Sequence, residues 1–188
     1  GVATTPVDLS KLVGKPLSVQ IALPADKLRY INLVCISGRY AGEDNKGLIY
    51  ELELQPWFWL ASKRVNSRIF HKKTVRQILA EVMGEYAAPG TRLEDKLGGN
   101  YPELEYTVQF METDLDFMRR MMEEFGINFH VSMAKDSHTM VLTDNNQSFP
   151  MGQTEAFDYN PNESVQILGD EYLSTMYAAQ QITTGAVR

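Results

Sequence analysis

Alternating apolar and polar residues dominate the first 55 positions of the chain. Leu17, Val19 and Ile21 alternate with polar neighbours, and a proline follows at position 24. The pattern predicts a second strand over residues 29–40 and a third over residues 48–55, on either side of a turn rich in Asp, Asn and Gly. Alternation of this kind is typical of strands that bury one face and leave the other in water.

A helix is predicted over residues 74–84. Thr74 and Gln77 fit a capping box, in which the threonine hydroxyl accepts from a free helix N–H and the glutamine reaches back. Apolar residues then follow at helical spacing, and Gly84 lies near the end. The apolar positions are Val75, Ile78, Leu79, Val82 and Met83.

A second helix is predicted over residues 114–125, after a similar box that begins at Thr113. Asp114 and Asp116 lie in its first turn, where negative charge is favoured by the helix dipole. Gly126 supplies the left-handed residue that ends it. The helical register places its methionines in the core, rather than on an adaptable binding surface. These are Met118, Met121 and Met122.

The remaining segments complete a β-dominated α+β fold. Residues 54–60 are expected to form a strand that reaches a domain boundary, and residues 87–102 a loop. A strand over 104–110 and a hairpin of residues 127–133 and 138–143 follow. In the tail, only residues 165–168 and 172–179 have a regular pattern. We expect residues 1–60 and 61–143 to be two domains, with residues 144–188 as a connector that returns toward the first.

Composition and charge exclude several classes of protein. The 188 residues include 44% hydrophobic residues and carry a net charge of −6, which disfavours a general nucleic-acid binder. Apolar runs are far shorter than the roughly 20 residues that span a bilayer, so no stable membrane insertion is expected. The single cysteine, Cys35, lies in an apolar stretch and is expected to be a small buried hydrophobe.

The charges are unevenly distributed along the chain. Residues 63–76 hold six Lys or Arg and no acid, whereas residues 136–187 hold seven Asp or Glu and no Lys or Arg. These stretches are either two separate solvated faces or complementary surfaces, within the chain or between subunits. The second interpretation predicts that Arg64, Arg68 and Lys72 meet acids of the tail in the assembled protein.

The chain offers almost no catalytic motif. A glycine-rich phosphate loop, an HExxH pair and a nucleophile elbow are all absent from the sequence. The three histidines are not spaced as a metal set, although His130 and His138 could face each other across the hairpin. We therefore expect no enzyme activity and no cofactor.

Two residue groups have a functional and a structural interpretation. Glu112, Asp114 and Asp116 could act as paired carboxylates on a glycoside, but the start of a helix explains them fully. Trp57 and Trp59 could be a sugar or peptide platform, or buried anchors that share one face of a strand.

Two segments resemble the VgrG family of type VI secretion spike proteins. Residues 54–82 are similar to the family's Pro-Trp-x-Trp-Leu strand end, Arg-Ile-Phe link and following helix. Residues 106–127 are similar to its Val-Gln-(Tyr/Phe)-x-Glu-x-Asp-Leu-Asp-Phe segment and Glu-Glu-x-Gly-Ile exit. Residues 12–17 and 182–187 fit more loosely, and Leu33 stands where the family has glycine. The structural or interface residues that the resemblance marks are Pro56, Trp57, Trp59, Arg64, Arg68, Phe70, Gln109, Glu112, Asp114, Asp116, Phe117 and Gly126.

The resemblance implies a mechanical function. Such hubs are similar to the baseplate hub of contractile phage tails, with two barrel-like domains in each chain. Three chains present six similar units, which adapts a threefold needle to the sixfold Hcp tube through head-to-tail interfaces. The implied partners are two further copies of the chain, the Hcp tube, and a needle tip or effector held by regions outside this sequence. The implied location is the bacterial cytoplasm during assembly and then a target cell.

The chain is accordingly expected to be a fragment of the hub region. Three other functions stay open at this stage. They are a hub of a contractile phage tail, a glycan-binding module built on Trp57 and Trp59, and a hydrolase that uses the three acids at residues 112–116.

Overall fold

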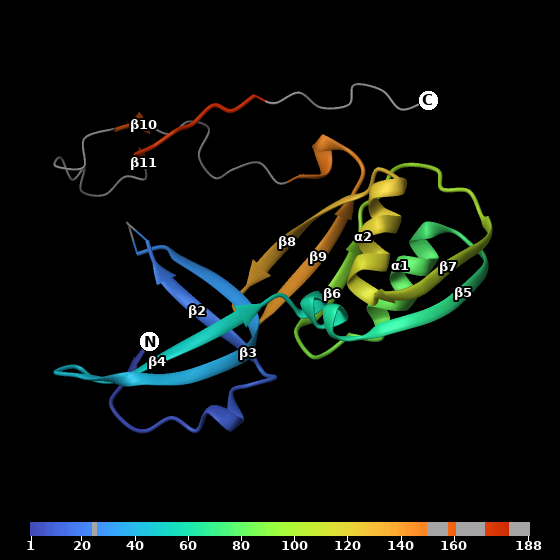
Figure 1. Ribbon diagram of the computed structural model, residues 1–188. Helices are drawn as coiled ribbons and strands as arrows, with labels where there is room; N and C mark the ends of the chain where they lie inside the picture. The colour runs from blue at the N-terminus through green and yellow to red at the C-terminus, as the bar shows by residue number, and fades with distance from the viewer. Residues whose placement is uncertain (24–25, 150–157, 161–171, 181–188) are drawn as a thin grey trace. The chain divides into compact units, whose positions relative to one another are not determined.

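The computed structural model describes residues 1–23, 26–149, 158–160 and 172–180 (Figure 1). The chain groups into two compact units, the first of residues 1–21 and 28–150 and the second of residues 22–27 and 151–188. In the second unit, β10 (Asp158–Tyr159) and β11 (Tyr172–Leu173) form a parallel pair. The elements discussed below belong to the first unit, apart from the last residue of β2. The predicted element at 165–168 lies outside the described residues.

A four-stranded sheet is built from the first 55 residues. Its strands are β1 (Val2–Ala3), β2 (Pro16–Ala22), β3 (Leu28–Asp44) and β4 (Gly47–Gln55), in the order β1-β4-β3-β2. The predicted strands and turn are confirmed, because β3 and β4 pair antiparallel around a turn at residues 45–46. A short 3-10 helix, η1 (Leu9–Lys11), begins at Asp8, whose carboxylate accepts from the Ser10 N–H.

A second sheet carries both helices on its inner face. It consists of β5 (Val65–Lys73) and β7 (Leu104–Thr113), which pair antiparallel. The predicted helices are confirmed as α1 (Val75–Gly84) and α2 (Asp114–Glu124). Thr74 and Gln77 form the expected reciprocal capping box. Gly126 has a φ of 65°, the left-handed conformation that glycine adopts without strain at a helix end.

A third sheet follows in the order β6-β9-β8. The predicted hairpin is confirmed as β8 (Asn128–Ala134) and β9 (Ser137–Thr143), and β6 (Thr91–Asp95) pairs with β9 in parallel. A short 3-10 helix, η3 (Asn146–Ser148), comes after it. The described strands therefore form separate sheets rather than one sheet through the whole chain, and strands predominate over helices, as expected.

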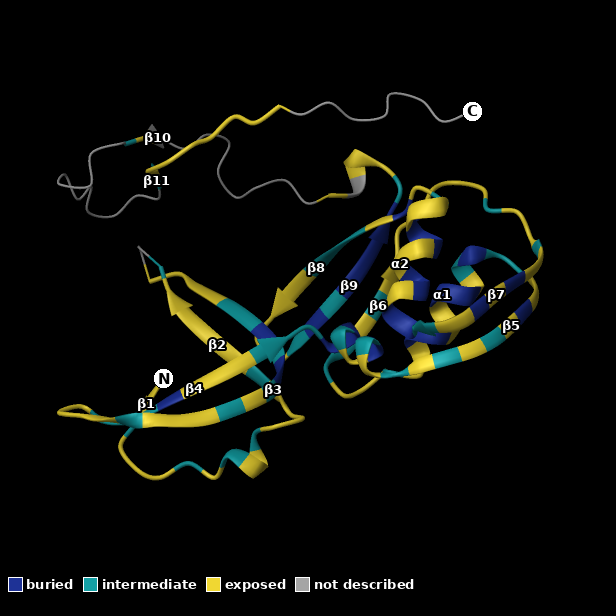
Figure 2. Cartoon of the chain, in the orientation of Figure 1, coloured by how far each residue is buried: buried dark blue, intermediate teal, exposed yellow. Residues whose placement is uncertain are grey.

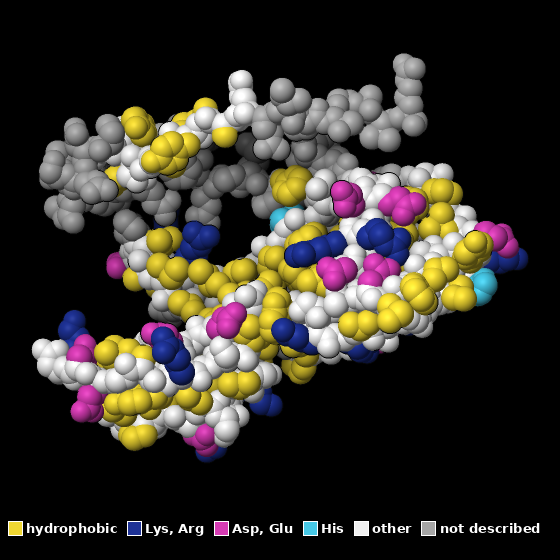
Figure 3. Space-filling model, in the orientation of Figure 1, with side chains coloured by type: hydrophobic (Ala, Val, Ile, Leu, Met, Phe, Trp, Pro, Cys, Tyr) yellow, Lys and Arg dark blue, Asp and Glu magenta, His cyan; other side chains and the backbone are white. Residues whose placement is uncertain are grey.

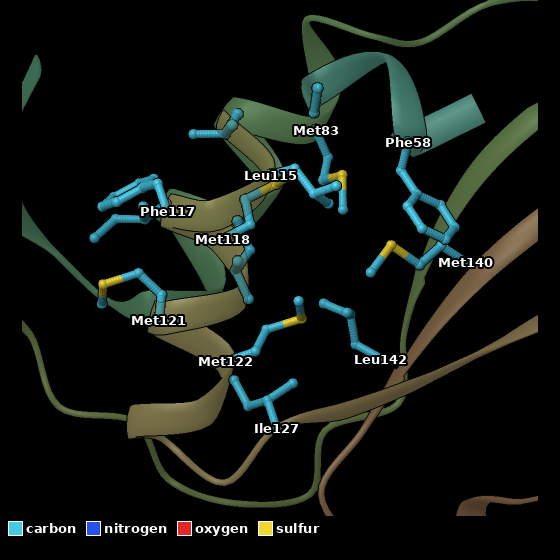
Figure 4. Packing of buried hydrophobic residues seen from close by; sticks show 14 of the residues in the cluster. Phe58, Met83, Leu115, Phe117, Met118, Met121, Met122, Ile127, Met140 and Leu142 are labelled. Atoms are coloured by element: carbon cyan, nitrogen blue, oxygen red, sulfur yellow. The ribbon is translucent and has the colours of Figure 1, made fainter. Parts of the chain in front are cut away.

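The hydrophobic core lies between the helices, η2 (Trp57–Lys63) and β9 (Figure 4). Met118, Met121 and Met122 of α2 all belong to this core, and Met122 lies beside Leu142 of β9. The prediction that these methionines are core residues is confirmed. Cys35 is also fully buried. Figure 2 shows the contrast with the four-stranded sheet, most of which is exposed or half-buried.

Three sequence-based predictions of local structure are wrong. Residues 57–63 form the 3-10 helix η2 rather than the end of a strand, because a helical turn after Pro56 directs Trp57, Phe58 and Ala61 into the core. The predicted loop at 87–102 contains β6, an edge strand in which Leu93 is the one apolar residue. The segment interpreted as a link after residue 64 is the nine-residue strand β5.

Candidate functional site

A single buried carboxylate organises the polar residues between β5, β7 and the helices. Asp114, the first residue of α2, is fully buried, and five side chains donate hydrogen bonds to its two oxygens. The donors are Arg64 at 2.8 Å, Asn66 at 3.0 Å, Arg68 at 2.7 Å, Tyr86 at 2.5 Å and Gln109 at 2.7 Å. We call these six residues the Asp114 cluster.

Strand register and a helix start bring the cluster together. Arg68 and Gln109 are register partners in β5 and β7, so both point to the inner face, and Arg68 Nε donates to Gln109 Oε1 at 2.9 Å. The backbone N–H of Asp114 donates to the carbonyl of Arg64 at 3.0 Å, which ties the start of α2 to the end of η2. The cluster therefore fixes α2 against the β5–β7 sheet.

One further acid, Glu85, balances the charges of the cluster. Glu85, just after α1, pairs with both Arg64 and Arg68, so two guanidinium groups face two carboxylates. Burial raises the pKa of Asp114, but the hydrogen bonds that it accepts outweigh this effect and hold the pKa well below its ordinary value of 3.8. Burial and the bond to Asp114 raise the pKa of Tyr86 to about 12.

The three neighbouring acids have separate roles that exclude shared catalysis. Asp114 is enclosed by its donors and is inaccessible to a substrate. Glu112 pairs with Arg120 at 2.6 Å, and Asp116 accepts from the Thr113 hydroxyl at 2.6 Å. The helix-start interpretation holds for Asp116, whereas Asp114 is a buried ion-pair centre. The hydrolase hypothesis is not supported by this arrangement.

The other residues marked by sequence lie in the core or at element ends. Phe70 of β5 stacks on Phe117 of α2 with ring centroids 5.5 Å apart. Pro56 precedes η2, and Gly126 follows α2. The tryptophans do not share a face, because they lie two residues apart in a 3-10 helix. Trp57 is buried, while Trp59 is half-buried beneath the Lys63 ammonium, 4.2 Å from its ring centroid.

Sequence reasoning missed Asn66, Tyr86 and Glu85. Asn66 lies two residues before Arg68 in β5, so recognition of that strand would have placed both side chains on its inner face. Tyr86 and Glu85 follow a helix with no distinguishing pattern.

Within the described residues, four of the six bases at 63–76 pair with acids at 81–114 rather than with the acidic tail. These bases are Arg64, Arg68, Lys73 and Arg76.

The two hairpin histidines do not face each other. His130 is paired with Val141 and His138 with Met133, so the proposed two-histidine site is wrong. His130 instead lines a hollow with Glu94, Lys96 and Phe149. Among the described residues, no group of three or more His, Cys, Asp or Glu is arranged to hold a metal ion.

The outer face of the β5–β7 sheet is apolar and exposed. Register pairs Ile69 with Val108 on this face, and their side chains are 60% and 38% exposed. A row of hydrophobic side chains follows the sheet in the space-filling view (Figure 3). The members of this apolar strip are Val65, Ile69, Tyr106, Val108, Phe110 and Met111. Apolar surface gathered along one sheet face makes this strip a candidate interaction surface.

Comparison with known proteins gives this architecture a family. The profile of the phage tail baseplate hub family (GPD) matches residues 2–188. The chain belongs to the phage tail baseplate hub family. Type VI secretion system spike proteins VgrG1c and VgrG1a of Pseudomonas aeruginosa are 34% and 33% identical to it, over 82% and 72% of its length. The resemblance to VgrG proteins is thereby confirmed.

The same comparisons define how much of the relatives this hub chain represents. It spans about a fifth of VgrG1c and of VgrG1a, 21% in each case. A solved Escherichia coli chain, c3393, is described as a type VI secretion component with structural similarity to the T4 tail proteins gp27 and gp5. It matches with a TM-score of 0.68 at 19% identity, over 85% of this chain and 43% of that chain. This likeness shows that the fold is hub-like.

Proposed function

We propose that the chain is a structural segment of the trimeric spike hub of a type VI secretion system, which adapts a threefold needle to the sixfold Hcp tube. Its membership of the hub family and the names of its curated relatives support the hub role. In this proposal residues 1–60 belong to one barrel-like domain and residues 61–143 to a second, with residues 144–188 as a connector. Hub chains that are first assembled in the cytoplasm are later delivered with the needle.

The apolar strip on β5–β7 is the observation that carries the assembly part of the proposal. Phe110 and Met111 are 71% and 73% exposed, although their aromatic and thioether groups lose nothing by burial and would gain from it. The inner face of the same sheet packs against α1 and α2, so the strip on the outer face is available to another surface. In a closed ring of three chains, that surface is a different face of the next subunit.

The role requires no bond to be made or broken. The Asp114 cluster locks α2 to the β5–β7 sheet and keeps the strip on a rigid support, as a part that transmits force requires. A needle tip or an effector would be held by other regions of the parent protein; one relative, VgrG1 of Vibrio cholerae, is named an actin cross-linking toxin and is matched over 9% of its length. No helix in the described part of the chain is long and apolar enough to cross a bilayer.

The oligomeric state of the full-length parent tests the proposal. We expect a trimer by mass in solution, and a shift toward monomer when Ile69→Ser and Phe110→Ser are combined on the strip. Val13→Ser is the control, because Val13 is 43% exposed and lies far from the strip in sequence. A parent that is monomeric at all concentrations would contradict the proposal, and a trimer unaffected by the double variant would remove the strip from the interface.

Two alternative functions are distinguished by observations on the same residues. A contractile phage hub shares the family, and a gene neighbourhood with sheath and tube genes but no capsid genes would exclude it. A glycan-binding module would need both indoles on an open face, whereas Trp57 is only 2% exposed and the Trp59 ring is covered by Lys63.

A further inference from the structure

Both ring nitrogens of His138 are occupied by groups from other parts of the fold. The imidazole is 1% exposed, and its Nε2 accepts from the backbone N–H of Trp57 at 2.8 Å. Its Nδ1 lies 2.8 Å from Oδ1 of Asn32. A backbone N–H only donates, so Nε2 carries no proton, and Nδ1 must carry the proton that is donated to Asn32. The packing thus selects one tautomer of the neutral imidazole.

The hydrogen bonds continue in the same direction beyond Asn32. Its Nδ2 donates to the Ser18 hydroxyl at 2.8 Å, and that hydroxyl donates to the carbonyl of Lys135 in the turn between β8 and β9. Four consecutive bonds, which we call the His138 relay, therefore connect η2, β9, β3, β2 and the hairpin turn. Each donor in the relay has one acceptor, and His138 is its only titratable side chain.

Few buried apolar side chains join the four-stranded sheet to the packed part of the first unit. In the described residues, Val34 is the one buried side chain of residues 1–55 that belongs to the main hydrophobic core. The strand β3 touches β8 and β9, and the backbone passes from β4 into η2 at Pro56. A connection with so few buried apolar side chains depends strongly on its hydrogen bonds.

We propose that the His138 relay is an acid-sensitive latch, which holds the four-stranded sheet against the β8–β9 hairpin while His138 is neutral and releases it when the ring is protonated. In the imidazolium form both nitrogens carry a proton. The N–H at Nε2 would then point at the N–H of Trp57, so the first bond of the relay is replaced by a repulsive contact.

The surroundings of His138 offer no charge that would stabilise the imidazolium. On its own sheet it is paired with Thr91 of β6 and Met133 of β8, and η2 and β3 present a backbone N–H and an amide. None of these groups titrates, and the nearby charged residues of the turn, Lys135 and Asp136, are exposed. Burial lowers the pKa of His138 below its ordinary value of 6.5, so release requires a pH below that value.

Distance measurements between paired spin labels test the latch directly. Labels are placed through Glu43→Cys in β3 and Ser132→Cys in β8, which are both exposed, while the buried Cys35 stays unlabelled. We expect a narrow distance distribution near pH 8 and a wider one in solution that is acidic enough to protonate His138. The midpoint should follow the His138 titration measured by NMR in the same sample.

Matched variants separate the latch from general acid effects. His138→Gln keeps an acceptor for Trp57 and a donor for Asn32 without a titrating group, so the distribution should stay narrow at both pH values. His130→Gln changes a histidine in the same hairpin, and its distance distribution should widen on acidification as that of the parent does. Asn32→Leu breaks the relay at its centre and should widen the distribution already near pH 8.

Three outcomes would overturn the latch. The first is a distribution that stays narrow after NMR shows His138 to be protonated, and the second is equal widening in the parent and in His138→Gln. The third is loss of near-ultraviolet circular dichroism together with widening, because the whole unit would then unfold rather than the joint open. None of these outcomes bears on trimer formation by the parent, so the latch and the hub proposal fail separately.

Discussion

Residues 1–55 and residues 56–143 differ in whether their strands and helices enclose a hydrophobic core. In the later region, two helices and two small sheets enclose a core in which Ile78, Leu79 and Phe117 are fully buried. In the earlier region, the four-stranded sheet leaves Val19 and Leu52 exposed by 42% and 38%. The later region thus supplies its own core, whereas the strands of the earlier one do not cover their own apolar surface.

The largest expected effect of a single substitution lies in the packed region, at the Asp114 cluster. Asp114→Asn leaves Arg64 and Arg68 without their buried counter-charge, so we expect the free energy of unfolding to fall by about 3–5 kcal/mol. Asp116→Asn is the control, since that neighbouring acid is exposed and leaves the Thr113 cap in place, so its change should cost about 1 kcal/mol or less. Equal losses in urea unfolding would show that the cluster is not the anchor of α2.

The Asp114 cluster should also affect how the free energy of unfolding depends on pH. Because the pKa of Asp114 is lower in the folded chain than its ordinary 3.8, its contribution is fully present above that value and is lost as the pH falls below it. The parent should therefore lose stability more steeply than Asp114→Asn on acidification below about pH 4. Parallel curves for the two proteins would contradict the lowered pKa.

The cluster also shows where sequence reasoning ends. The residues around Asp114 include the family motif positions Arg64, Arg68 and Gln109, and sequence marked all of them. Sequence reasoning explained Asp114 by helix capping, because the residues of a capping motif lie within four positions of one another. The partners that bury it lie up to 50 residues away, and the β5–β7 register and the end of α1 bring them together only in the folded chain.

Local periodicity predicted the elements that are long enough to show a repeating pattern of apolar residues. Both helices begin where their capping residues stand, and β2 to β4 follow the alternation of the first 55 residues. It failed for η2, whose aromatic run after Pro56 has the composition of a strand. It failed again for β6, a five-residue edge strand of mostly polar side chains, because its parallel pairing with β9 leaves no local pattern.

The tryptophans of η2 provide a comparison within a single turn. Trp57→Ala should cost about 3–5 kcal/mol, because a fully packed indole leaves a cavity. Trp59→Ala should cost about 1–2 kcal/mol, because its ring is only partly buried and lies beneath the Lys63 ammonium. Thermal and urea unfolding of both variants measure the difference. A larger loss for Trp59 would restore the strand-like arrangement in which both indoles are anchors.

Leucine truncation compares the two regions with the chemistry held constant. Leu79→Ala removes a fully buried side chain of α1 and should cost about 2–5 kcal/mol. Leu52→Ala removes one that is 38% exposed in β4, and should cost about 1 kcal/mol or less in the isolated chain. In the trimeric parent the second value should rise if a neighbour covers the sheet. Equal costs in the isolated chain would show that the four-stranded sheet has a core of its own.

The smallest expected effect comes from an ion pair of the exposed sheet. Arg39 and Glu51 are register partners of β3 and β4 with 2.5 Å between Nη2 and Oε2, a distance as short as those within the Asp114 cluster. Their side chains are 72% and 58% exposed, so water already solvates both charges and the pair gains little by meeting. A double-mutant cycle with Arg39→Gln and Glu51→Gln should give a coupling of about 0–1 kcal/mol, which falls further as salt screens the charges. A coupling that equals the loss in Asp114→Asn would mean that distance, and not burial, sets the strength of these pairs, and the contrast between the two regions would then rest on packing alone.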